Sequence, residues 1–222
     1  MYDVERITIE VASAIACFIL VRFMIKPFRL TGETRYLGLP LGFGFLGISS
    51  VITAMAVSIP NFFTYQLAWL QLLPRTFAFL FLAVTYYFSK EVSKNSRLVW
   101  NLTISSLILV LVASVISVII IPQFDSNSYS TSSVFFRVCN LICLSYISIQ
   151  SLRSHIQNLE PSTIVIPLGF ILLGISQYSI LIWSVERGIF AFWGALSLRL
   201  AALTIFLLVS YKAFYSSNKL VV

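Results

Sequence analysis

Charged side chains are scarce in this chain, and the residues that most often build metal sites are scarcer still. Only 10% of its 222 residues are charged, with eight acidic residues, three cysteines and a single histidine, His155. A metal site usually needs several His, Cys or carboxylate ligands, and one histidine in a predicted loop does not supply them. The cysteines, Cys17, Cys139 and Cys143, lie inside apolar segments, which favours packing over disulfide formation. We therefore expect no metal site and no cofactor.

The same shortage argues against catalysis. Hydrolysis inside a membrane needs paired carboxylates, a Ser/His pair or a metal ion. The apolar segments of this chain contain one acidic residue well inside a segment, Glu10, and no histidine. We expect that the protein is not an enzyme.

Apolar residues, in contrast, are abundant. They make up 59% of the chain, and the mean hydropathy is +0.93, which indicates an integral membrane protein in a lipid bilayer. The net charge of +7 would suggest nucleic acid as a partner of a soluble protein. Most of the basic residues flank apolar segments, as they do in cytoplasmic loops, so no nucleic acid is expected. The chain is predicted to be a multi-pass protein of the cell membrane.

Seven apolar segments are long enough to cross a bilayer, which takes about 20 helical residues. Their length favours helices over barrel strands, which are about half as long and alternate in polarity. The fold predicted from the sequence is all-α, with one membrane domain over residues 1–222. The predicted spans are 7–25, 37–58, 66–89, 98–121, 134–152, 163–185 and 189–214.

Basic residues are distributed unequally between the two sides of this arrangement. Ten fall on one side of the predicted spans and only two, Arg6 and Arg187, on the other. Because cytoplasmic loops are enriched in Lys and Arg, the amino terminus is predicted outside and the carboxyl terminus inside. The polar stretch 122–133 is then predicted to be an outer loop.

A ten-residue motif occurs twice. Residues 40–49 (PLGFGFLGIS) and 167–176 (PLGFILLGIS) are identical at eight positions, 127 residues apart. At an offset of 124, the next spans match at Trp69 and Trp193, Arg75 and Arg199, and other positions. This pattern predicts an internal repeat of helices 1–3 and 5–7, with repeat A over 7–91, a linker helix over 98–121 and repeat B over 134–216. Such parallel repeats occur in transporters. Small residues let helices approach closely, and the motif glycines are predicted to do so: Gly42, Gly47, Gly169 and Gly174.

In helix number, orientation and the prolines that open the second and sixth spans, Pro40 and Pro167, the chain resembles the SWEET and PQ-loop transporters. It departs from them because the first and fifth predicted spans have no matching prolines. Its Pro122-Gln123 dipeptide falls in a predicted outer loop. The plan also resembles that of microbial rhodopsins. The seventh span, however, has Arg199 where a retinal Schiff base would need a lysine, so no retinal is expected.

Arg75 and Arg199 are the most informative polar residues. Each lies about 12–15 Å into its predicted span, near the middle of a hydrocarbon core about 30 Å thick. A charge at that depth should face the bundle interior and have a partner. Guanidinium groups suit carboxylates and phosphates, so the two arginines are predicted to bind an anionic ligand, with Gln71 nearby. Trp69 and Trp193 are predicted to cover the same cavity from its outer side.

Other roles for these residues fit the sequence as well. Pro74 frees the backbone carbonyl of Leu70, and Arg75 could serve that carbonyl as a structural residue. The two tryptophans could instead lie at the membrane interface. Glu10 and Arg137 both lie near the outer surface and are predicted to form an ion pair.

We expect a receptor-like or sensor protein that binds a small anionic or amphipathic ligand between its helices. The predicted spans and loops contain no output domain, so a sensor would need a cytoplasmic or membrane partner protein. A small-solute transporter of 3+1+3 plan is one alternative, and an accessory subunit of a membrane complex is another.

Overall fold

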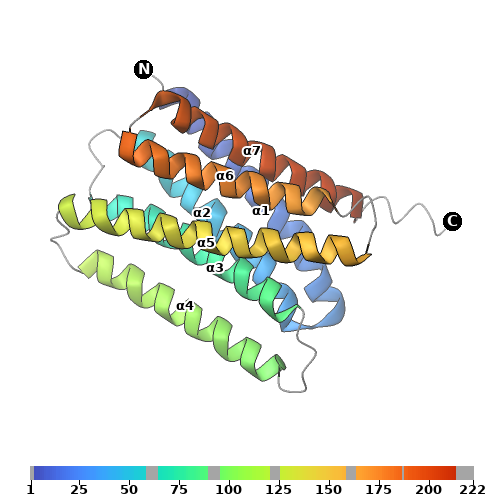
Figure 1. Ribbon diagram of the computed structural model, residues 1–222. Helices are drawn as coiled ribbons and strands as arrows, with labels where there is room; N and C mark the ends of the chain where they lie inside the picture. The colour runs from blue at the N-terminus through green and yellow to red at the C-terminus, as the bar shows by residue number, and fades with distance from the viewer. Residues whose placement is uncertain are drawn as a thin grey trace.

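The computed structural model describes residues 3–58, 65–89, 96–120, 126–158, 164–186 and 188–213, and within them the fold is all-α (Figure 1). Seven helices in these ranges are long and apolar enough to cross a membrane, which confirms the predicted number of spans and suggests a multi-pass membrane protein. A short 3-10 turn, η1, joins the first two helices. The elements are α1 (Asp3–Thr31), η1 (Thr34–Leu37), α2 (Gly38–Ser58), α3 (Tyr65–Phe88), α4 (Ser96–Ile120), α5 (Ser126–Asn158), α6 (Val165–Glu186) and α7 (Ile189–Tyr211).

Two helices, α5 and α1, are longer than the sequence predicts. The polar stretch predicted as a loop over 122–133 is helical from Ser126 onward, and His155 lies within α5 rather than in a loop. No proline or glycine occurs between residues 126 and 158, so nothing in the sequence interrupts this helix. Residues 122–125 lie outside the described ranges. α1 is also longer than predicted, and it ends where Gly32 adopts a φ of 68° and its N–H donates to the Phe28 carbonyl at 2.8 Å.

Six of the helices form a closed ring. Going around it, α1 contacts α2, α2 contacts α3, α3 contacts α5, α5 contacts α6, α6 contacts α7, and α7 returns to α1. α4 lies outside this ring against α3 and η1, at the edge of the bundle in Figure 1. Only 11% of its membrane-spanning segment is buried, against 61% for α3. α4 is therefore peripheral, and most of its surface is left for lipid.

The face of α3 that meets α4 is a stripe of large apolar residues. Trp69, Leu73, Phe77 and Phe81 are spaced four apart, which places them along one side of a helix. All are buried, and they form a cluster with Leu111 and Val118 of α4. This spacing explains why α4 packs on α3.

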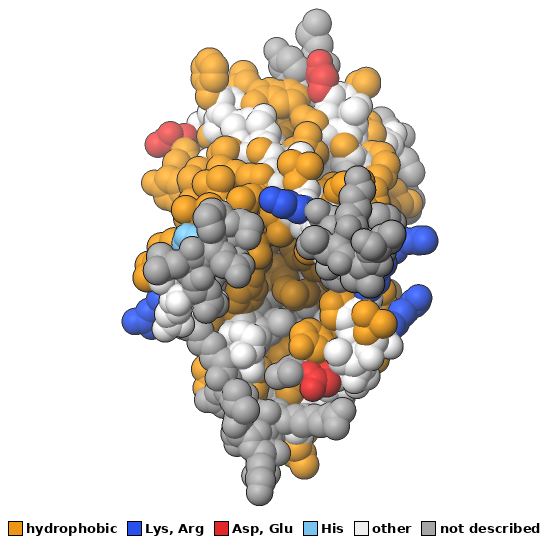
Figure 2. Space-filling model, turned by 90° about the vertical axis from the view of Figure 1, so that its right-hand side faces the viewer, with side chains coloured by type: hydrophobic (Ala, Val, Ile, Leu, Met, Phe, Trp, Pro, Cys, Tyr) orange, Lys and Arg blue, Asp and Glu red, His pale blue; other side chains and the backbone are white. Residues whose placement is uncertain are grey.

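α1, α3, α5 and α7 all end at the same end of the bundle (Figure 1). Arg29 lies in the last turn of α1, and Lys212 follows directly on α7. Figure 2 looks at this end and shows Lys and Arg side chains around its edge, with apolar side chains lining a hollow between them. We refer to it below as the basic end.

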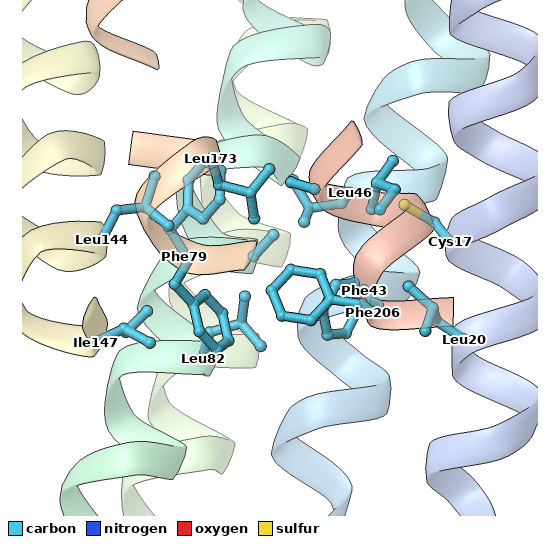
Figure 3. Packing of buried hydrophobic residues seen from close by; sticks show 14 of the residues in the cluster. Cys17, Leu20, Phe43, Leu46, Phe79, Leu82, Leu144, Ile147, Leu173 and Phe206 are labelled. Atoms are coloured by element: carbon cyan, nitrogen blue, oxygen red, sulfur yellow. The ribbon is translucent and has the colours of Figure 1, made fainter. Parts of the chain in front are cut away.

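Inside the ring, one apolar cluster receives side chains from all six helices (Figure 3). Phe206 contacts both Phe43 and Phe170, with ring centroids 5.4 and 4.7 Å apart. This central cluster consists of Ala16, Cys17, Leu20, Phe43, Leu46, Ala78, Phe79, Leu82, Leu144, Ile147, Phe170, Leu173, Ala202, Leu203 and Phe206.

The motif glycines behave as predicted at three of four positions. A Cβ on Gly42 would come within 2.6 Å of Leu82 Cγ, and one on Gly169 within 2.7 Å of Phe206 Cζ. At Gly47 the nearest atom, Cys17 Cβ, would lie 3.2 Å away. A Cβ on Gly174 would meet nothing within 4 Å, so the prediction that this glycine serves close packing is wrong. Close approach therefore occurs at the three glycines that face a side chain of a neighbouring helix.

Candidate functional site

A cavity of about 360 Å³ lies between the helices of the ring, in the half of the bundle where α1, α3, α5 and α7 begin. Five charged residues line it: Arg6 and Glu10 of α1, Arg75 of α3, Arg137 of α5 and Arg199 of α7. No residue of α4 is among the described residues that line it. The cavity belongs to the six-helix ring.

Helical spacing explains why these side chains meet. Residues three or four positions apart lie on one face of a helix. Each contributing pair has that spacing: Arg6 and Glu10 on α1, Gln71 and Arg75 on α3, Ser133 and Arg137 on α5, and Leu196 and Arg199 on α7. Arg75, Arg199 and Gln71 all line this one cavity.

Glu10 forms a buried ion pair with Arg199. Arg199 Nη2 lies 2.7 Å from Glu10 Oε1, and only 6% and 4% of the two side chains are exposed. The charge of Arg75 also acts on this carboxylate, and the Ser50 hydroxyl lies beside it. Glu10 and Arg137 line the same cavity, and their predicted ion pair stays a prediction.

Side-chain direction explains this pairing. Glu10 lies seven residues into α1 and Arg199 ten residues into α7, about 10 and 15 Å from the helix starts. Both helices begin at the same end (Figure 1). Helical side chains lean toward the amino terminus, so the long Arg199 side chain reaches back toward the level of Glu10.

Positive charge exceeds negative charge in the cavity. Its described lining contains four arginines and one glutamate, a formal excess of three positive charges. Arg137 Nη1 donates to the Ile180 carbonyl of α6 at 2.8 Å, which orients the guanidinium group without cancelling its charge. An excess of charge of one sign inside a membrane protein is costly. A bound anion would reduce that cost.

Additional polar atoms are available to a ligand. In the part of the chain that the structure describes, Gln71 Nε2 and Arg199 Nε are buried without a hydrogen-bond partner. Buried donors normally have partners, often ordered water or a ligand. Thr53, Ser133 and Ser184 also contribute to the lining.

One wall of the cavity is apolar and aromatic. It is formed by Ile180 and Trp183 of α6 with Phe192 and Leu196 of α7. The rings of Trp183 and Phe192 lie 5.1 Å apart, and the Arg6 guanidinium carbon lies 5.3 Å from the centre of the Phe192 ring. A cation over an aromatic face is held electrostatically. This wall would suit the apolar part of an amphipathic ligand.

The two tryptophans predicted to cover the cavity are not among the described residues that line it. Trp69 is buried in the cluster that faces α4, with its ring 5.9 Å from that of Phe136. Trp193 lies 5.7 Å from Phe192, and neither tryptophan is among the described residues of the lining. Their part in ligand binding stays a prediction.

Sequence analysis did not assign Arg6, Trp183 or Phe192 to the site. Helical spacing could have found two of them, because Arg6 precedes Glu10 by four residues and Phe192 precedes Arg199 by seven. Trp183 depends on the contact between α6 and α7 and has no such signal.

Among the described residues, no group of three His, Cys, Asp or Glu side chains is placed to hold a metal ion. No protein-family model matches this chain, and neither a curated protein nor a solved structure was found to be similar to it. The argument for function therefore depends on the geometry of the cavity.

Proposed function

We propose that this protein binds a small anion, such as a carboxylate or phosphate with an apolar body, in the cavity between its helices, and acts as a receptor-like or sensor membrane protein. The observation that best supports anion binding is the excess of arginine over glutamate in the cavity lining. Guanidinium groups donate paired hydrogen bonds to carboxylate and phosphate oxygens. The volume of about 360 Å³ falls within the usual range for small-molecule sites.

The central apolar cluster supports binding rather than free passage. Ala78 and Phe79 follow Arg75 by one helical turn, and Ala202 and Leu203 follow Arg199 in the same way. These side chains belong to the central cluster, one helical turn from the arginines toward the basic end. A ligand in the cavity would be separated by them from the basic end.

The orientation that fits this proposal has the cavity toward the outside and the basic end in the cytoplasm. It rests on the unequal distribution of Lys and Arg between the two sides. The basic end would then be the surface available to a cytoplasmic partner.

A carrier is the second candidate, and contacts that recur at equivalent positions favour it. Ser49 Oγ donates to the Gln71 carbonyl at 2.8 Å, and Ser176 Oγ donates to the Ala195 carbonyl at 2.7 Å. These residues are related by the same offsets, 127 and 124, that relate the matched sequence segments.

The ring has the corresponding symmetry, because α3 lies beside α5 as α7 lies beside α1. These observations support an internal repeat, with the cavity at the interface of its two halves. Substrate sites of transporters with such repeats lie at that interface.

Binding is tested by thermal unfolding of the purified protein in detergent with acetate, benzoate or inorganic phosphate. A ligand that binds only the folded state raises the unfolding temperature as its concentration increases. We expect Arg75→Gln to lower the affinity about tenfold or more, because a hydrogen bond to a charged group is worth about 1.5–3 kcal/mol. Arg22→Gln is the matched control, since Arg22 is exposed and does not line the cavity. If no probe stabilises the wild type, or if both variants lose equal affinity, the proposal fails.

Receptor and carrier are separated in proteoliposomes. If the protein is a carrier, proteoliposomes loaded with unlabelled benzoate should accumulate labelled benzoate by exchange. Proteoliposomes with the Arg75→Gln variant should not. A receptor should bind benzoate in detergent and show no exchange above protein-free liposomes.

A further inference from the structure

Glu10 lies where the charges of the cavity meet. Its carboxylate is 2.7 Å from Arg199 Nη2, and only 4% of its side chain is exposed. The charge of Arg75 acts on the same carboxylate, and the Ser50 hydroxyl lies beside it. Glu10 is the one acidic residue among the described residues of the lining. It is therefore an anion that two arginines of the cavity already share.

The other groups that face Glu10 do not change their charge near neutral pH. Arginines reach the lining from four helices: Arg6 of α1, Arg75 of α3, Arg137 of α5 and Arg199 of α7. Guanidinium groups do not lose their proton in proteins. α2, which packs on α1, contributes only the hydroxyls of Ser50 and Thr53, and α6 adds no charged residue to the described lining. η1 also packs on α1 and gives no residue to that lining.

Two other titratable groups lie outside this lining. Cys17 is two turns further along α1 and is buried in the central cluster, and thiols ordinarily ionise at about pH 8.5. His155 lies in the last turn of α5, at the basic end. Among the described residues of the lining, Glu10 is thus the one side chain that can gain a proton.

An anion that enters the cavity comes close to the Glu10 carboxylate. To bind Arg199 or Arg75 through hydrogen bonds, it has to lie within about 3 Å of a guanidinium group whose charge already acts on Glu10. Two carboxylates that share a poorly solvated site do not both stay ionised, and one of them takes up a proton.

The surroundings of Glu10 suit the protonated form. A carboxyl O–H needs an acceptor, and guanidinium groups are donors only. The Ser50 hydroxyl beside Glu10 can accept this hydrogen bond. The ligand faces the arginines and is best bound as a carboxylate, so the proton belongs on Glu10.

We infer that the cavity binds a proton together with its anionic ligand, and that Glu10 accepts the proton. The inference rests on the proposed function, because it assigns a second, smaller ligand to the same cavity. On binding, H⁺ adds to the Glu10 carboxylate, and the ligand carboxylate replaces it as the partner of Arg199. One proton and one monocarboxylate bring no net charge into the bundle, which avoids the cost of adding charge there.

The coupling gives ligand binding a pH dependence of defined sign. Proton and anion each raise the affinity for the other by the same factor, because binding free energies are reciprocal. The affinity for the anion therefore rises as the pH falls. A receptor of this kind would respond to a carboxylate most strongly in acidic surroundings.

Calorimetry of the purified protein in detergent measures the proton directly. Benzoate is titrated at about pH 6 in two cationic buffers with different heats of ionisation, and the difference in binding heat gives the number of protons taken up. We expect roughly 0.5–1 proton for each benzoate bound. The affinity should fall by about threefold to tenfold for each pH unit between about pH 6 and 7.5, where benzoate itself stays ionised.

Two substitutions identify the group that takes the proton. Glu10→Gln resembles a protonated glutamate, so its affinity for benzoate at about pH 7.5 should be roughly tenfold or more above that of the wild type and should not change with pH. Benzoate should also raise its unfolding temperature by more than it raises that of the wild type. His155→Gln is the matched control, because His155 is the only histidine in the sequence and histidine ordinarily titrates over this range. It should keep both the pH dependence and the proton uptake.

The outcomes distinguish the two levels of the argument. Wild-type protein that no anion stabilises would overturn the proposed function. Wild type that binds benzoate without proton uptake, or with the same affinity at every pH, would overturn only the coupling. Glu10→Gln that keeps the wild-type pH dependence, or His155→Gln that loses it, would overturn the role of Glu10. The proton count of the wild type decides the coupling whether or not Glu10→Gln folds.

Discussion

The buried pair of Glu10 and Arg199 allows the sharpest test of how the bundle holds its charges. The two groups lie 2.7 Å apart with 4% and 6% of their side chains exposed, so neither is well solvated when its partner is removed. Breaking a buried pair by removing one partner costs about 3–5 kcal/mol, since it leaves an uncompensated charge. For a chain of this size, that corresponds to a fall of roughly 6–20 °C in unfolding temperature.

The two single substitutions should differ in magnitude. In Arg199→Gln, the Glu10 carboxylate still has the charge of Arg75 acting on it. In Glu10→Gln, the cavity loses the one glutamate of its described lining, and the arginines are left to repel each other. We expect Glu10→Gln to be the more destabilising change. The double variant should be more stable than Glu10→Gln alone, because it removes both charges.

The assay is thermal unfolding in detergent without added anions, followed by tryptophan fluorescence, for the wild type and the three variants. The coupling free energy is the difference between the change in unfolding free energy of the double variant and the sum of the changes of the two single variants. For neighbouring groups it is typically about 0.5–3 kcal/mol. Additive effects below about 1 kcal/mol each would refute this reasoning, since exposed ion pairs behave that way.

Two further predictions follow from packing and charge distribution. Gly169→Ala should lower the free energy of unfolding by about 1–3 kcal/mol, because its Cβ would meet Phe206. Gly174→Ala has nothing within 4 Å of its Cβ and should be neutral or slightly stabilising. Equal unfolding temperatures for the two variants would contradict the packing argument. Cysteines introduced between residues 122 and 133 should react with a membrane-impermeant thiol reagent from outside the cell, and cysteines near Lys94 only after permeabilisation; the reverse result would invert the proposed orientation.

Hydropathy predicted the spans well because the bilayer imposes a length of about 20 apolar residues on each helix. The ends of α5 differ from the prediction, because the polar residues near Ser126 and His155 favour loops although no proline or glycine stands there. Composition predicts which residues can lie in lipid. It does not predict where a polar helix stops.

The sequence also identified Arg75, Arg199 and Gln71 as residues that belong together. A charge deep in an apolar span has to face the bundle interior, and residues four apart on one helix share a face. That argument uses only a helix and a membrane, so it required no knowledge of which helices are neighbours.

Which charges neutralise one another was decided by the tertiary structure alone. The ring closes with α7 against α1, and this contact brings Glu10 to Arg199, residues that are far apart in the chain. It likewise brings Trp183 of α6 and Phe192 of α7 into one cavity wall, while Trp69 turns to α4. Helical periodicity fixes the face on which a residue lies. Only the packing of all the helices decides what that face meets, because it depends on the order of the helices around the ring and on the depth to which each side chain reaches.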